Sequence, residues 1–202
     1  MVQNFHLQNF MAVMKDGARP NQFYCDLSLP AALIGSIPNG ALAENRMKFY
    51  IKATSIPSMT NGEIVIPFRG GQYKIPGDKT FGDWSITVVN DTDFVIRDAL
   101  ERWHDLIIGN VNRDSAVEDD PMAYMSNGTV AQLSRNDTTL KTYLMTGCWP
   151  KEIGEIALSS DSENQIEEFT VTFALQWWES STSRNNTSGD TFGATQGGQS
   201  VI

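Results

Sequence analysis

The chain has 202 residues, of which 41% are hydrophobic. This length is enough for one domain with a well-buried core and too short for two domains of ordinary size with a tail. The formal net charge of −9 is unevenly placed, since residues 1–90 hold 8 Lys/Arg against 6 Asp/Glu and residues 91–202 hold 7 against 18. The basic residues are scattered singly and form no cluster that could neutralise phosphates, which excludes a nucleic-acid-binding protein. No basic start precedes an apolar run, and no window approaches the ~18 apolar residues of a membrane span, so we expect a cytosolic protein without membrane insertion.

The first half of the chain predicts short strands separated by turn residues. Alternating or β-branched apolar residues indicate strands at residues 23–29, 47–56, 63–68, 72–75 and 83–91. Turn-forming residues indicate breaks at Gly62, Pro67, Gly70, Gly71, Pro76 and Gly77.

In the second half, strands are expected at residues 138–149, 155–160 and 167–178. The last strand is long, and its apolar residues alternate along one side: Phe169, Val171, Phe173, Leu175 and Trp177. We expect that side to face the core and the Thr- and Gln-bearing side to face a wetter surface.

One helix is predicted at about residues 92–108. Asp91, Thr92 or Asp93 can cap its N-terminus, and Gly109 can end it. Its apolar residues recur with helical spacing and form one stripe: Ile96, Ala99, Leu100, Trp103, Leu106 and Ile107. We expect this helix to pack on a sheet through that stripe, with Trp103 at its centre and the charged side outward.

After residue 179 the composition changes to Ser, Thr and Gly, which is too poor in apolar residues to order itself by burial. We therefore expect a globular domain at residues 1–179 and a C-terminal extension at 180–202, held by a neighbouring subunit or by an intrachain groove. Cys25 and Cys148 have no CxxC partner, so we expect two reduced thiols packed as small hydrophobes rather than a disulfide.

Residues 69–81, RGGQYKIPGDKTF, look at first like a phosphate-binding loop. A P-loop needs the spacing G-x-x-x-x-G-K-[ST] and a helix directly after it. Here Gly71 and Gly77 enclose five residues, Asp78 stands before Lys79, and a strand pattern follows. A nucleotide site is therefore not expected.

Catalytic and metal-binding patterns are also missing. There are two histidines: His6 lies near the start of the chain and His104 on the polar side of the helix. No group of His, Cys and carboxylate residues therefore has the sequence spacing of metal ligands. The acidic clusters at residues 118–120 and 161–168 lack the spacing of a calcium loop and fit solvated loops and strand ends. We expect no enzyme activity and no cofactor.

Residues 66–103, IPFRGGQYKIPGDKTFGDWSITVVNDTDFVIRDALERW, contain four linked motifs. These are an RG-x-x-x-K-x-x-GD-[RK]-TF turn, a W-x-[VI]-[TS]-[VI] strand, an ND-x-DF link and an IR-x-A-x-E-x-W helix. In this order they resemble the tail tube proteins of contractile-tailed (T4-like) bacteriophages. Upstream segments (GARPNQF, LSLP and IPSMTNGEIVIPF) look similar too, so the resemblance covers roughly residues 15–180. The tail after residue 180 and the acidic segment VEDDPMAYMSNGT depart from it.

The resemblance implies a mostly β fold: a single β-barrel, or a sandwich of two packed antiparallel sheets, with one flanking helix. It implies a structural virion protein that forms hexameric rings, stacked into the inner tail tube through which phage DNA is ejected. The implied partners are further copies of the chain, the tail sheath protein, and baseplate and tail terminator proteins, with the tape-measure protein and DNA transiently in the lumen. The protein would be located in the phage tail after assembly in the host cytoplasm. The alternatives are a tube protein of a phage-like contractile injection or secretion system, and a small β-barrel enzyme or carbohydrate-binding module.

This resemblance turns three groups of residues into candidate assembly sites. In residues 69–81 the glycines and Pro76 are expected to shape a hairpin and loop at a contact between subunits or rings, with the candidate contact residues Arg69, Gly70, Lys74, Gly77, Asp78 and Lys79. Because DNA must slide without sticking, a neutral or acidic lumen wall is expected, bordered by Glu167, Glu168, Thr170 and Thr172; the alternative is that these acids face the sheath. The sheath-facing side of the helix would carry Asp98, Glu101 and Asp105.

Overall fold

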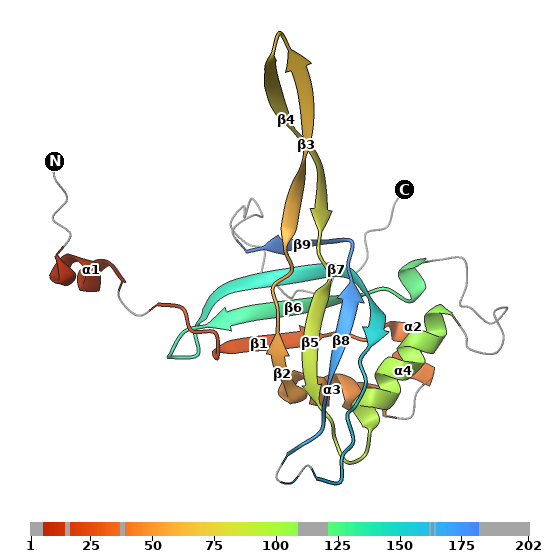
Figure 1. Ribbon diagram of the computed structural model, residues 1–202. Helices are drawn as coiled ribbons and strands as arrows, with labels where there is room; N and C mark the ends of the chain where they lie inside the picture. Colours follow the sequence, from red (N-terminus) through yellow and green to blue (C-terminus); the bar gives the residue numbers. More distant parts are fainter. Residues whose placement is uncertain are drawn as a thin grey trace, which may run out of the picture.

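The computed structural model describes residues 6–14, 17–36, 39–108, 121–161, 163 and 165–181. Strands dominate; most of the helices gather at one end of the sheets, and one lies apart from them (Figure 1). In chain order the elements are α1 (Leu7–Met14), β1 (Phe23–Leu27), α2 (Ala31–Ser36), α3 (Gly40–Tyr50), β2 (Ile51–Thr54), β3 (Met59–Phe68), β4 (Gly71–Phe81), β5 (Trp84–Val89), α4 (Val95–Ile107), the 3₁₀ turn η2 (Pro121–Ala123), β6 (Ser126–Leu133), β7 (Thr139–Ile153), β8 (Glu168–Ala174) and β9 (Trp177–Ser180).

The main sheet is antiparallel, with strand order β1-β6-β7-β8-β5-β2. The long strand β7 serves two halves of this sheet, because its first part pairs with β6 and β9 and its last part, from Trp149, pairs with β8. Between these parts Gly147 takes a left-handed conformation, with φ of 67°. The sheet folds over at this point, so the two halves face each other. The prediction of a mostly β fold with packed antiparallel sheets is confirmed, although the barrel is open: β1 pairs with β6 only and β2 with β5 only in the described part of the chain.

The core lies between the two halves of the sheet and the helices. Its largest fully buried side chains include Trp84, Trp103 and Phe173, whose rings pack with centroids 5.4 and 5.8 Å apart. Cys25 and Cys148 are buried in the same core as free thiols, as predicted, and burial raises the pKa of each to about 12.

Helix α4 confirms the predicted apolar stripe, since Ile96, Ala99, Leu100 and Trp103 are all fully buried. The prediction of its N-terminus is wrong: the helix begins at Val95 after Phe94, which has a φ of 54°, and it has no side-chain cap. Its last residue is Ile107, and Gly109 lies outside the described residues.

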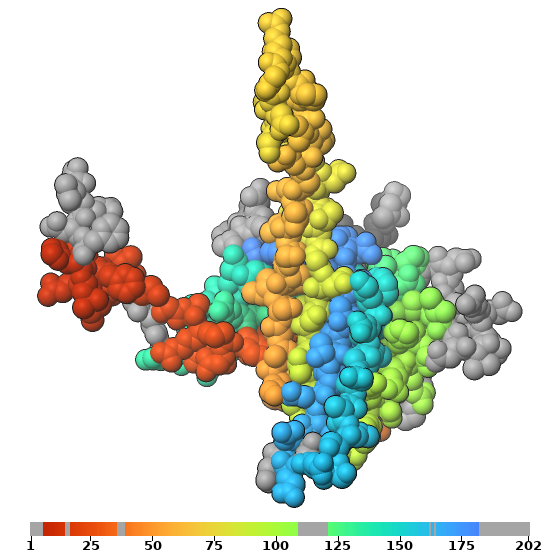
Figure 2. Space-filling view, viewed as in Figure 1, coloured from red at the N-terminus to blue at the C-terminus, as the bar shows by residue number. Residues whose placement is uncertain are grey.

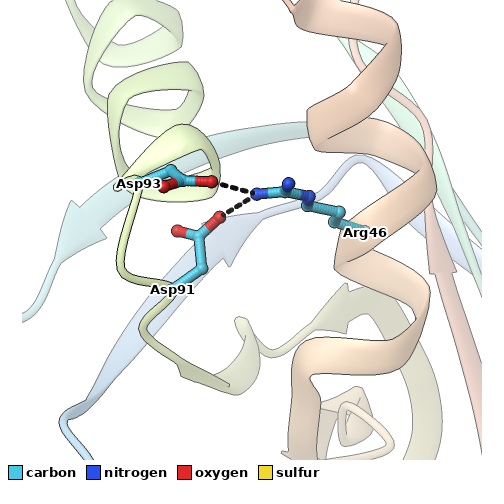
Figure 3. A network of polar contacts seen from close by, with 3 residues as sticks. All are labelled: Arg46, Asp91 and Asp93. Atoms are coloured by element: carbon cyan, nitrogen blue, oxygen red, sulfur yellow. Dashed lines mark hydrogen bonds and ion pairs between the residues drawn. The ribbon is translucent and has the colours of Figure 1, made fainter.

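Asp91, one of the predicted caps, precedes α4; it is buried and forms an ion pair with a residue of α3. Its Oδ2 accepts a hydrogen bond from Nη1 of Arg46, on α3, at 2.9 Å, and Asp93 Oδ2 lies 3.3 Å from the same nitrogen (Figure 3). These hydrogen bonds raise the pKa of Arg46. The ND-x-DF link therefore fastens α4 to α3 rather than capping α4.

Several predicted elements differ from the structure. The segment 47–56 was expected to be one strand, but α3 continues to Tyr50 and β2 starts only at Ile51. Helices α1, α2 and α3 and strand β6 were not predicted, and residues 155–160 form no strand. The predicted strand 167–178 breaks after Ala174, because the backbone N–H of Gln176 donates to Thr146 and the chain then starts β9 along β7. Trp177 is consequently exposed rather than in the core.

Candidate assembly surfaces

Strands β3 and β4 form a hairpin that projects from the body of the protein (Figures 1 and 2). Its turn consists of Arg69 and Gly70, whose φ angles of 46° and 85° are both positive, as a tight hairpin turn of primed type requires. A hairpin was predicted here, but Gly62, Pro67, Pro76 and Gly77 were wrongly expected to break the strands. The two prolines are tolerated because a two-stranded ribbon has two unpaired edges, where a missing N–H costs no ladder hydrogen bond. The two glycines face each other where the strands come closest, at the register shift of the ribbon.

The six predicted interface residues all lie on this hairpin. Arg69 and Gly70 form its tip, and Nζ of Lys74 lies 2.9 Å from Oε1 of Glu63 on the facing strand. Gly77 and Asp78 lie where the β3–β4 register shifts, opposite Gly62. A Cβ on Gly62 would stand 3.2 Å from the Asp78 carbonyl oxygen, so glycine permits the close approach of the strands at this bulge.

The two faces of the hairpin differ in chemistry. Cross-strand partners share a face, and successive residues alternate between faces. One face, called here the hairpin apolar face, carries Ile64, Ile66, Phe68, Tyr73 and Ile75. The opposite face carries Glu63, Val65, Pro67, Gln72, Lys74 and Pro76. Within the protomer every member of the apolar face is exposed except Ile75, which is half-buried.

A second surface is the outer side of strands β2, β5, β8 and the end of β7, which lie side by side in Figure 2. The alternation predicted for β8 is confirmed, since Phe169 and Val171 are buried and Thr170 is exposed. Thr170 pairs with Thr87 of β5, with 3.4 Å between their hydroxyl oxygens, and Thr172 pairs with Ser85. The polar side of the sheet is thus a surface of hydroxyl groups.

The two glutamates at the border of this surface each have a side-chain partner. Nζ of Lys52, on β2, lies 2.5 Å from Oε2 of Glu168. Oε2 of Glu167, just before β8, accepts a hydrogen bond from the side chain of Asn90 at 3.0 Å. Beside Lys52 and Glu168 lies an open hollow of about 580 Å³, which Val89 and Ile166 also line. Lys52 therefore offsets the charge of Glu168, whereas the neutral amide of Asn90 does not offset that of Glu167.

The third surface is the outer side of α4. Asp98, Glu101 and Asp105 are exposed there, as expected for the charged side of the helix. Glu101 accepts a hydrogen bond at 2.5 Å from Arg97, whose guanidinium also lies 4.9 Å from the centre of the Phe169 ring. The residue types on this face suit a polar contact rather than an apolar one.

Two further observations bear on the kind of site. Among the residues that the structure describes, no group of three or more His, Cys, Asp or Glu side chains could hold a metal ion. No helix in the same part of the chain has the length and hydrophobicity needed to span a membrane. The acidic cluster at 118–120 and the extension from residue 182 lie outside the described residues, so the structure does not test the expectations for them.

Comparison with solved structures supports the fold. The chain is similar to a chain in the cryo-EM structure of an extracellular contractile injection system, the PVC sheath–tube complex in its extended state, with a TM-score of 0.55, 13% identity, and coverage of 87% of this chain and 97% of that chain. It is also similar to a chain in the baseplate of the anti-feeding prophage, with a TM-score of 0.56 and 12% identity over 83% of this chain and 97% of that chain. At these identities the likeness concerns the fold alone.

Comparison of sequences identifies the family. A family model described as phage tail tube protein matches residues 18–181. The chain is 33% identical over 165 residues to the tail tube protein gp19 of Enterobacteria phage T4, which covers 81% of this chain and 92% of that protein. It is 30% identical over 118 residues to the tail tube protein of Serratia phage KSP90, or 58% of this chain and 65% of that protein. The chain therefore belongs to the phage tail tube protein family and is a structural component of the phage tail.

Proposed function

We propose that copies of this chain assemble into six-fold rings, which stack into the hollow tube through which phage DNA leaves the particle. The observation that carries the proposal is the projecting β3–β4 hairpin, in a chain of the tail tube family. A two-stranded hairpin is marginally stable in water on its own, and this one leaves Ile66, Phe68 and Tyr73 exposed. A contact with a further copy would stabilise it by burying these side chains, each worth about 1.5–3 kcal/mol when fully covered.

The three surfaces then have distinct roles in the proposed tube. The hairpin, including Arg69, Gly70, Lys74, Gly77, Asp78 and Lys79, contacts a neighbouring subunit or ring. The hydroxyl-rich outer side of β5 and β8, with Thr170 and Thr172, lines the lumen, bordered by Glu167 and Glu168. Supporting this, the described part of that surface offers DNA hydroxyl groups and a lysine already paired with Glu168, so a sliding phosphate backbone meets little to hold it.

The exposed side of α4 faces outward in the same arrangement. Asp98, Glu101 and Asp105 would contact the tail sheath protein, while the ends of the tube meet baseplate and tail terminator proteins. The tape-measure protein would precede DNA in the lumen. We further propose that the protein has no catalytic activity; membership of a structural family supports this.

Charge substitution on the hairpin tests the assembly proposal. Ile66→Asp places a charge on the apolar face, where burial of an unpaired charge is strongly unfavourable, so tubes of the purified variant should be lost in negative-stain images. Gln72→Glu introduces the same charge on the opposite face and serves as the control, which should still assemble. A wild-type chain that sediments as a monomer and forms no rings under any assembly condition would contradict the proposal.

A further inference from the structure

Helix α1 exposes apolar side chains that no described part of its own protomer buries. None of its residues is buried. Helical spacing brings Leu7, Phe10, Met11 and Met14 onto one side, called here the α1 apolar stripe, and all four are more than half exposed. Figure 1 shows α1 at a distance from the sheets, joined to them by the segment that leads into β1.

An eight-residue helix of this kind is not stable by itself in water, because nucleation is costly and too few hydrogen bonds follow. Its stability therefore depends on a surface that covers the stripe. The helix has the sequence LQNFMAVM and carries no charged residue, so that surface should be apolar and uncharged too.

The hairpin apolar face meets these requirements. It consists of aliphatic and aromatic side chains, and the ion pair between Lys74 and Glu63 lies on the opposite face. The one charged group beside it is the Arg69 guanidinium at the tip, 5.3 Å from the centre of the Phe68 ring, so among the described residues the uncharged part runs from Ile64 to Ile66 with Tyr73 and Ile75. The dimensions agree: eight residues of helix extend over about 12 Å, and the five positions from Ile64 to Phe68 extend over about 14 Å between the outer Cα atoms. In an assembly of identical copies the α1 apolar stripe and the hairpin apolar face are present in equal numbers, so each stripe can have a face.

We propose that α1 of one copy packs its apolar stripe across the hairpin apolar face of a second copy. The inference rests on the proposed function, since it assumes that copies associate, and it names which two elements meet. In Figure 1 the hairpin rises from β2 and β5 whereas α1 extends sideways from β1, so the two surfaces are apart within a protomer. Exchange of a terminal element between identical copies is a low-cost way to join them.

Cross-linking between separately labelled chains tests this pairing. One chain carries Phe10→Cys and a size tag, and the other carries Tyr73→Cys; both positions are exposed in the protomer, so neither change should disturb folding. The full-length chains are mixed, assembled and treated with a short bis-maleimide at neutral pH. Cys25 and Cys148 are buried and their pKa values are about 12, so they stay unreactive in the folded protein.

The expected result is a cross-linked dimer of one tagged and one untagged chain. Its yield should exceed, on the order of tenfold, that of the control mixture in which Gln8→Cys replaces Phe10→Cys, because docking raises the local concentration of one thiol at the other. Gln8 follows Leu7 in the same helix, so its side chain lies about 100° round the helix axis from that of Leu7 and outside the stripe.

Two results would overturn the inference. If the chain carrying both Phe10→Cys and Tyr73→Cys cross-links only within itself when diluted into an excess of wild-type chain, α1 covers its own hairpin. If tubes assemble and the mixture with Phe10→Cys cross-links no more than the control mixture with Gln8→Cys, another partner covers these surfaces, and the proposed function stands without this contact. Failure of the wild-type chain to assemble at all would instead contradict the proposed function.

Discussion

At Gly128 the two halves of the folded sheet approach closely, and replacing it with alanine tests this packing. A Cβ at Gly128, on β6, would stand within 2.5 Å of Cη2 of Trp84, on β5. Real atoms do not come this close, so the ring or the strand must move. Trp84 cannot move freely, because its Nε1 donates to Thr54 Oγ1 at 2.9 Å and its ring packs on Phe173.

The cost follows from these contacts. Overpacking of a filled core costs about 1–3 kcal/mol, and loss of the Trp84 hydrogen bond adds about 1 kcal/mol. Gly128→Ala should therefore lower the free energy of unfolding by roughly 2–4 kcal/mol. Urea unfolding followed by far-UV circular dichroism, at a concentration where the chain is monomeric, measures it.

Two comparisons make this measurement specific. Gly71→Ala is the control, because its Cβ would meet nothing closer than 3.5 Å, and an effect within about 0.5 kcal/mol is expected. In a Trp84→Phe background the cost of Gly128→Ala should fall by at least about 1 kcal/mol, since the clashing ring atoms are gone. An equal cost in both backgrounds, or a cost of less than about 0.5 kcal/mol for Gly128→Ala alone, would refute the packing of the two halves described above.

Three further outcomes are expected. Trp103→Ala should cost about 3–5 kcal/mol in urea unfolding because the side chain is fully buried, whereas the exposed Trp177→Ala should cost less than about 1 kcal/mol; similar losses would contradict the assigned core. Burial raises the pKa of both Cys25 and Cys148 above the unfolded value, so their contribution to stability is complete below about pH 8.5 and declines as the pH rises from there toward about 12. The decline should be smaller in Cys25→Val; the same pH dependence of stability in the variant and the wild type would count against a raised pKa of Cys25. Thr170→Lys should leave tube assembly intact and slow DNA ejection from phage particles, because the lysine would bind phosphates in the lumen; an unchanged ejection rate would place Thr170 outside the lumen.

The sequence predicted those elements whose pattern is local. The stripe of α4 and the alternation of Phe169, Val171 and Phe173 in β8 follow directly from helical and strand periodicity, and the structure confirms both. The hairpin followed from its glycines and from the motif around Gly70. Its strands were predicted too short, because the expected strands began after Gly62 and ended before Pro76, whereas both residues lie within the ribbon.

The predictions that were wrong concern features that depend on contacts between residues far apart in the sequence. Strand β6 has few strongly β-forming residues, and it is a strand because β1 and β7 pair with it on both sides. Asp91 has the residue type and position of a helix cap, but Arg46, 45 residues away, binds it instead. The break between β8 and β9 arises from the bend at Gly147, where a neighbouring strand redirects the chain. Single-sequence patterns carry no signal for such pairings.

The candidate sites divide in the same way. All six hairpin residues predicted as an interface lie together on one projecting element, because they are adjacent in sequence. The apolar face beside them was not anticipated, since it appears only once Ile66 is paired with Tyr73 in register. Its periodicity in residues 64–68, with Ile64, Ile66 and Phe68 alternating, was the available signal.

A cryo-EM reconstruction of tubes assembled from the purified full-length chain tests the central claim most directly. The account predicts stacked six-fold rings, with the hydroxyl-bearing side of β5 and β8 facing the bore, the β3–β4 hairpin buried against another copy, and α4 on the outside. A reconstruction in which α4 lines the bore, or in which the hairpin extends uncovered into solvent, would contradict it.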